Sequence, residues 1–161
     1  MAEDRKHLST SAWGALLQVH AAAVPVIDQK LLTEAGMPLR FYDVLLELAA
    51  APGRKLRMSD LADRVVLSRT RVSRLVDEMA TARLLVREQN PQDARSAYAA
   101  LTELGLQRYR QAAPTYLAAI EEYFAQHLQD RELKALAAAL QRVLAAQPTP
   151  SVSTHRGQVQ N

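Results

Sequence analysis

The sequence contains no cysteine, which excludes disulfides, thiolate metal sites and cysteine nucleophiles. Its four histidines are scattered, and no two stand at the spacing of paired metal ligands. There is no Gly-rich P-loop, no Gly-x-Ser-x-Gly elbow and no His-Glu-x-x-His motif. These absences predict a protein that is not an enzyme and that holds no metal or other cofactor.

Glycine and aromatic residues are scarce, with five glycines and 5% aromatics against 48% hydrophobic residues. Abundant alanine and leucine favour helix over sheet, and 161 residues suffice to bury a core. The charged N-terminus, residues 1–7, is followed by no signal-peptide core, and no apolar run approaches the roughly 20 residues that span a bilayer. The sequence therefore predicts a mainly α-helical, cytoplasmic protein without membrane contact.

Positive charge is concentrated in one part of the chain. Residues 54–95 hold ten Lys/Arg against six Asp/Glu, whereas the remainder holds ten against eleven. A local basic excess favours a polyanionic partner such as nucleic acid. The alternative is a solvated basic face without a partner.

The pattern over residues 59–82 predicts two short helices that meet at a tight turn. The first has apolar residues four apart, and the second has them at i, i+3, i+4 and i+7, which is typical of one buried stripe. Ser59 caps the first helix and Ser68 the second. The arrangement resembles a helix-turn-helix, whose second helix reads the DNA major groove. The apolar positions are Leu61, Val65, Leu67, Val72, Leu75, Val76 and Met79.

A strand is predicted at 84–88, followed by a polar turn at 90–95 and a returning strand at 97–101. Two strands placed directly after a helix-turn-helix make a wing. The connector 54–58 favours a further strand of one or two residues.

Outer helices are predicted at 8–34, kinked or split at Pro25, at 39–51, at 102–128, capped by Thr102 and bent near Pro114, and at 130–147. This gives an N-terminal dimerisation helix (1–38), a winged helix-turn-helix domain (39–101), C-terminal dimerisation helices (102–147) and a disordered tail (148–161). The apolar stripes of the outer helices predict a homodimer, because a small winged domain is too small to cover them. A monomeric helical bundle is the alternative.

Several of these segments together resemble the MarR family of bacterial transcription regulators. The resemblance rests on Leu67-Ser68-Arg69 at the turn, Val72 to Asp77 in the second helix, Leu84 to Arg87, Asp93-Ala94-Arg95 and Leu101 to Gly105. It implies a ligand-responsive repressor that binds a palindromic operator as a homodimer. The sequence departs from the family at Val66 and at Ala82-Arg83, where members usually have glycine.

The candidate DNA contacts lie on the second helix and in the wing. Arginine matches the O6 and N7 acceptors of guanine, so Arg71 and Arg74, one turn apart, are expected at bases. For each of these arginines the alternative is an ion pair with Asp77 or Glu78. The resemblance implies that Arg95 enters the minor groove, held by Asp93. The full set is Ser68, Arg69, Thr70, Arg71, Ser73, Arg74, Asp93 and Arg95.

The family resemblance also implies a crevice for a small anionic or phenolic effector. Trp13, His20, Tyr42 and Asp43 are the candidates for lining it, and the tryptophan and aspartate resemble those of urate-responsive members. For Trp13 and His20 the alternative is a packed core or interface position. A second alternative for the whole chain is a dimeric winged-helix interaction protein that does not bind DNA.

Overall fold

The computed structural model describes residues 2–65, 69–90 and 93–147. The chain forms two compact units, one ending at His127 and one beginning at Leu128. The first unit runs through α1 (Ala2–Ala35), α2 (Leu39–Ala50), β1 (Lys55–Arg57), α3 (Met58–Arg64), α4 (Arg69–Thr81), β2 (Leu85–Asn90), β3 (Asp93–Leu101) and α5 (Glu103–Tyr123). Short 3-10 turns follow α2 at Pro52–Arg54 and α5 at Ala125–His127, and α6 (Asp130–Ala145) belongs to the second unit.

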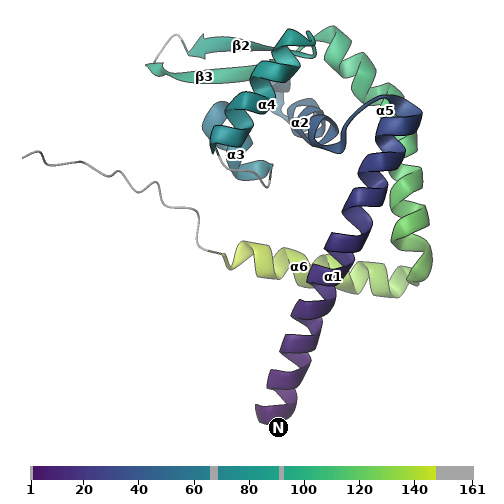
Figure 1. Cartoon of the computed structure of the whole chain (residues 1–161). Coiled ribbons are helices and arrows are strands. Elements are labelled where there is room, and N and C mark those ends of the chain that lie inside the picture. Colours follow the sequence, from purple (N-terminus) through teal and green to yellow (C-terminus); the bar gives the residue numbers. More distant parts are fainter. Residues whose placement is uncertain (1, 66–68, 91–92, 148–161) are drawn as a thin grey trace, which may run out of the picture. The chain divides into compact units, whose positions relative to one another are not determined.

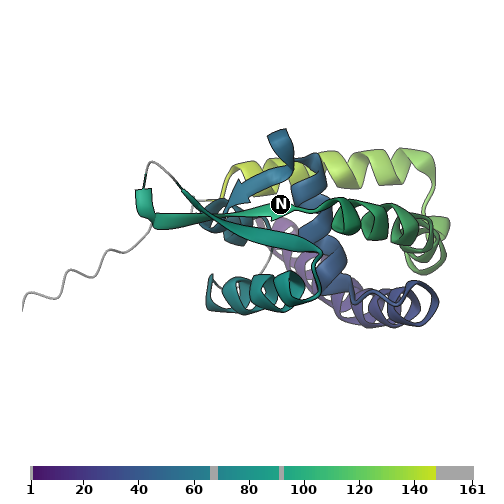
Figure 2. The same ribbon diagram turned by 90° about the horizontal axis from the view of Figure 1, so that it is seen from above.

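The predicted fold class is confirmed: the protein is mainly helical, with one small sheet that carries the wing. The three strands are antiparallel in the order β1-β3-β2. The β2–β3 hairpin extends away from the helices (Figures 1 and 2). Its strands are longer than predicted and reach Asn90 and Asp93, because the residues assigned to a turn continue the ladder.

The core lies between α2, α3, α4 and the sheet. Every described residue of the predicted helix-turn-helix stripe is buried, from Leu61 and Val65 through Val72, Leu75, Val76 and Met79. Leu67, Ser68 and Val66 lie outside the described residues, as does the predicted tail at 148–161. The buried face of α4 therefore fixes which of its residues point outward.

Three details of the helices differ from the predictions. α1 begins at Ala2 and is not split at Pro25, and the first helix of the pair begins at Met58, so Ser59 is not its N-cap. The Ser59 hydroxyl instead donates to Asp60 Oδ1 at 3.0 Å. α5 ends at Tyr123, short of the predicted residue 128.

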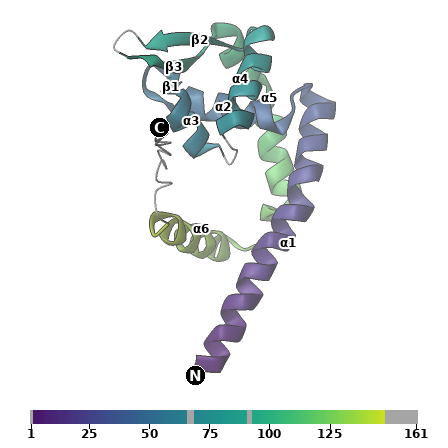
Figure 3. The same cartoon turned by 60° about the vertical axis from the view of Figure 1, so that its left-hand side comes forward.

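The prediction that no apolar run could span a bilayer is wrong for α1. Between Leu8 and Ile27 this helix has no Asp, Glu, Lys or Arg, and by length and composition it could cross a membrane. α1 lies beside α5, and its N-terminal part extends beyond that helix (Figures 1 and 3). Apolar side chains are exposed along it, Trp13 by 61% among them.

The C-terminal end of α4 is held by a Schellman motif without glycine. Leu84 N–H donates to Met79 O at 3.0 Å, and Arg83 N–H donates to Ala80 O at 2.9 Å. Arg83 takes the left-handed conformation, with φ of 59°. An arginine therefore occupies the position where glycine is usual, and the missing glycine does not prevent the motif.

Thr102 joins the end of the wing to the end of α4. Its hydroxyl lies 2.9 Å from Leu84 O and accepts the N–H of Gly105 at 2.9 Å, which confirms the predicted N-cap of α5. Thr102 N–H also donates to Leu84 O at 3.2 Å. The same backbone carbonyl thus ties the strand, the following helix and the recognition-helix end together.

Candidate nucleic-acid interface

The outward face of α4 is polar and basic. Thr70, Arg71 and Arg74 are exposed and Ser73 is half-buried, while the opposite face of the helix packs into the core. Arg71 and Arg74 are three residues apart, so their side chains share one face. This places two guanidinium groups on the solvent side of the second helix of the pair.

The acidic residues of α4 are engaged by other elements. Asp77 Oδ1 lies 3.0 Å from Arg87 Nη1 of β2, and Glu78 Oε2 lies 3.7 Å from Arg40 Nη2 of α2. In the described part of the chain, Arg71 and Arg74 have no ion pair or hydrogen-bond partner through their side chains. The alternative of an ion pair with Asp77 or Glu78 is therefore not realised for these two arginines.

Arg87 is a residue of the interface that sequence reasoning missed. Besides Asp77, its Nη1 lies 3.5 Å from Ser73 Oγ, so one guanidinium spans from the wing to the outward face of α4. Arg87 and Ser73 also line a hollow of about 190 Å³ with Met58 and Ser59 at the start of α3. The available signal was an exposed arginine in the strand that directly follows α4.

A second basic group lies on β1, beside the hairpin. Lys55 Nζ is 5.3 Å from the centroid of the Tyr98 ring, and the Arg57 guanidinium carbon is 6.0 Å from it on the same ring. Arg57 Nε donates to the Tyr98 hydroxyl at 3.4 Å, and Lys55 pairs with Glu88 at 3.7 Å. These cation–π contacts hold both cations against β3. Sequence reasoning assigned Tyr98 only to a strand.

The wing turn is fixed by side-chain hydrogen bonds. Asn90 is 5% exposed, and its Nδ2 donates to Ser96 Oγ at 2.8 Å. The Ser96 hydroxyl lies 3.2 Å from Asp93 O. Asp93 is exposed at the start of β3, and Arg95 belongs to the same strand. Ser68 and the side chains of Arg69 and Arg95 lie outside the described structure, so their predicted roles remain predictions.

A model of the MarR family matches residues 35–96, which span α2, the helix pair and the wing up to β3. The MarR family transcriptional regulator AbsC from Streptomyces coelicolor is 31% identical. That alignment covers 84% of this chain and 91% of AbsC, with a TM-score of 0.76. This chain belongs to the MarR family.

Two further MarR structures resemble it along most of their length. A second regulator from Streptomyces coelicolor, solved in complex with DNA, is 28% identical over 89% of this chain and 91% of its own, with a TM-score of 0.80. The regulator CouR from Rhodococcus jostii, solved with p-coumaroyl-CoA, is 26% identical over 88% and 96%, with a TM-score of 0.72. No curated protein sequence matches. The protein is thus a MarR family transcription regulator, and the family is not one of enzymes.

The four candidate effector residues of this MarR protein occupy different environments. Trp13 is 61% exposed and His20 is exposed on α1, so neither packs in the core of the chain. Tyr42 is 2% exposed, and its ring centroid lies 4.3 Å from that of Tyr116. Burial, and then the nearby carboxylates, raise the pKa of Asp43 to about 6. The grouping of these four residues around one ligand stays a prediction.

Proposed function

We propose that this MarR protein binds a palindromic operator in double-stranded DNA as a homodimer and acts as a ligand-responsive repressor. The observation that carries the proposal is the pair Arg71 and Arg74, exposed on α4 without acidic partners. A guanidinium that no carboxylate occupies can donate two hydrogen bonds to guanine in the major groove. The relative solved with DNA supports the same partner.

The remaining predicted contacts divide between phosphates and the minor groove. Ser68, Thr70 and Ser73 carry hydroxyls suited to phosphates or base edges, and Arg69 stands at the first residue of α4. Arg95 is proposed to enter the flanking minor groove from the wing, with Asp93 holding it in place. Such contacts position the protein on the duplex, while Arg71 and Arg74 read its sequence.

The homodimer is proposed from the apolar side chains that α1 exposes. A large exposed apolar face on a soluble protein marks a contact surface. We assign this face to a second copy, because two-fold DNA readers match two half-sites one helical turn apart. The same assignment places the protein in the cytoplasm, with α1 packed on protein and not in lipid. The residues are Leu8, Trp13, Leu16, Leu17, Val19, Val26 and Leu32.

Ligand response is proposed from the family and from the predicted crevice. CouR was solved with p-coumaroyl-CoA, an anionic ligand with a phenolic group. Trp13, His20, Tyr42 and Asp43 remain the candidates for a small anionic or phenolic effector. A thermal-shift screen with aromatic acids, purines and phenols tests whether one of these classes stabilises the protein.

Selection of bound duplexes from a random pool tests the proposed function most directly. We expect an enriched palindrome whose half-sites lie about 10 base pairs apart. The logarithm of the affinity should fall linearly with the logarithm of salt concentration, by about 0.9 per phosphate contacted. The double variant Arg71→Ala, Arg74→Ala serves as the control that should enrich no sequence. A parent protein that enriches none would overturn the proposal.

A further inference from the structure

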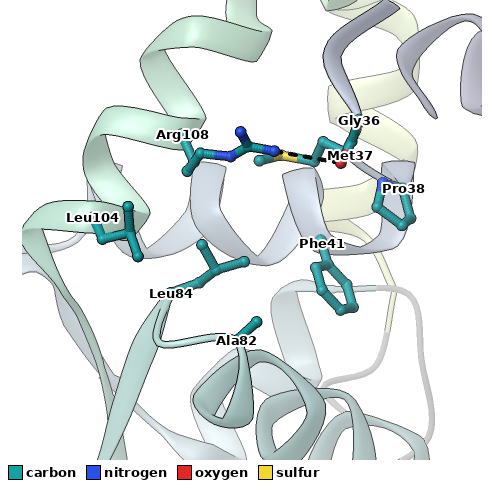
Figure 4. A pocket seen from close by; sticks show the side chains of 8 residues that line it. All are labelled: Gly36, Met37, Pro38, Phe41, Ala82, Leu84, Leu104 and Arg108. Atoms are coloured by element: carbon teal, nitrogen blue, oxygen red, sulfur yellow. Dashed lines mark hydrogen bonds between the residues drawn. The ribbon is translucent and has the colours of Figure 1, made fainter. Parts of the chain in front are cut away.

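A pocket of about 390 Å³ lies where four parts of the first unit meet (Figure 4). The corner between α1 and α2 contributes Met37 and Pro38, and α2 contributes Phe41. The turn between α4 and β2 contributes Leu84, and α5 contributes Leu104 and Arg108. None of the residues predicted to bind an effector lines this pocket, so it is a different site.

The walls of the pocket are apolar except at one group. Met37, Pro38, Phe41, Leu84 and Leu104 present hydrocarbon, sulfur and ring surface, which favours an apolar occupant. Leu104 is 43% exposed although it is a large hydrophobic side chain. An occupant in contact with Leu104 would remove part of this surface from water, which is favourable.

Arg108 is the one charged residue among the residues that line the pocket. It is half-buried, and its only printed bond is a long one, from Nη2 to Gly36 O at 3.4 Å. In the described part of the chain no carboxylate pairs with it. In Figure 4 its guanidinium reaches across the pocket toward Gly36 and Met37. A guanidinium offers a planar fork that matches a carboxylate, and most of its donors here are unused.

The pocket is also connected to the end of the recognition helix. Ala82 and Leu84, which line it, stand on either side of Arg83, the left-handed residue of the Schellman motif. Leu84 O is bound by Thr102 at the start of α5. An occupant touching Ala82 and Leu84 would therefore press on the joint that sets the position of α4 against α5.

From this geometry we infer that the pocket binds a small apolar carboxylate, with Arg108 on the carboxylate and the apolar walls on the body of the ligand. Binding there weakens operator binding through the α4–β2 turn. This second part rests on the proposed function, whereas binding itself does not. The charge of Arg108 selects the anion, and the cavity volume limits the ligand to one or two fused rings.

Isothermal titration calorimetry on the full chain with 2-naphthoate tests the site, with neutral 2-naphthamide as the matched ligand. We expect the acid to bind at least ten-fold more tightly than the amide. Arg108→Gln should remove that preference, and Arg108→Lys should keep part of it. Arg110→Gln is the matched control, because Arg110 is exposed on the same helix and does not line the pocket. Circular dichroism melting curves show whether each variant is folded.

Two results would overturn the binding site: no heat with 2-naphthoate, or equal affinity for acid and amide in the parent protein. Because these measurements use the parent, they stand even if a variant fails to fold. For the coupling, a gel shift with the selected duplex should show at least three-fold weaker binding at saturating 2-naphthoate, and no change in Arg108→Gln. Unchanged operator affinity in the parent overturns the coupling alone. If the parent binds no duplex, the proposed function fails while the calorimetry still decides the site.

Discussion

Gly105 lies directly against the backbone carbonyl of Leu84, with no room for a Cβ between them. A Cβ at this position would fall far inside van der Waals contact with Leu84 O and 2.8 Å from Leu101 Cδ1. The contact holds the start of α5 against the end of the recognition helix. The glycine in the Leu-Thr-x-x-Gly segment is therefore required by close packing, at a backbone conformation that other residues could adopt.

Gly105→Ala should lower the free energy of unfolding by about 2 kcal/mol or more, because backbone must shift to admit the methyl group. Urea unfolding at pH 7 measures the change. Gln107→Ala, an exposed substitution on the same helix, is the control and should stay within about 0.5 kcal/mol of the parent. A Gly105→Ala protein as stable as that control would contradict the close contact.

Arg83→Gly should stabilise the protein. Arg83 holds a positive φ, which costs a residue with a Cβ roughly 1–2 kcal/mol, and glycine adopts it freely. Part of that gain is lost to the greater freedom of glycine in the unfolded chain, so we expect a net gain of about 0.5–1 kcal/mol. Ala82→Gly is the matched control, because Ala82 has no positive φ and should be destabilised by glycine. Equal effects at the two positions would show that backbone conformation does not decide them.

The helix-turn-helix, the wing and the α5 cap could be predicted from the sequence, since each depends on local periodicity or on one capping residue. Val72, Leu75, Val76 and Met79 identified the buried face of α4 in this way. The engagement of Asp77 by Arg87 could not be predicted, because it joins a helix to a strand through tertiary packing. The pocket beside Arg108 likewise combines segments about seventy residues apart in the sequence. Pro25 was misjudged because tertiary contacts can keep a helix continuous past a proline.

Arg71→Ala and Arg74→Ala should each weaken operator binding and relax its sequence preference. Each lost bidentate contact to guanine corresponds to about 1–3 kcal/mol of discrimination. Arg95→Ala should weaken binding to all duplexes more evenly, since the minor groove carries little sequence information. Gel-shift titrations with the selected duplex and with scrambled duplexes separate the two patterns. Arg110→Ala is the control, and parental affinity in all three test variants would refute the assignment.

Arg87→Gln should reduce operator affinity about three- to ten-fold with little loss of stability. The Arg87–Asp77 ion pair is solvent-exposed, so it contributes at most about 1 kcal/mol to folding. Its expected effect is to hold the wing and α4 in register for DNA. A double-mutant cycle with Asp77→Asn, read out by operator affinity, should show that the two effects are not additive. Strict additivity would mean that the pair does not act as a unit on DNA.

Asp43→Asn should stabilise the protein more at neutral than at acidic pH. The pKa of the Asp43 carboxyl in the folded state is raised to about 6, first by burial and then by Glu47 and Asp28. Because this value lies above that of an unfolded aspartate, the folded protein binds the proton more tightly. Ionisation therefore opposes folding increasingly as the pH rises from about 4 to above 6, and the penalty is complete above that.

The amide has no such penalty, so the stability difference between Asp43→Asn and the parent should be large at pH 7.5 and shrink toward pH 4.5. Urea unfolding at pH 7.5, 6.0 and 4.5 measures it. Arg64, which lies 3.4 Å from Glu47, is present in both proteins, so its charge affects them alike. A difference that stays constant with pH would trace to packing or hydrogen bonding of the amide. A difference that grows toward acid would reverse the sign of the pKa shift and refute the burial of the Asp43 carboxylate.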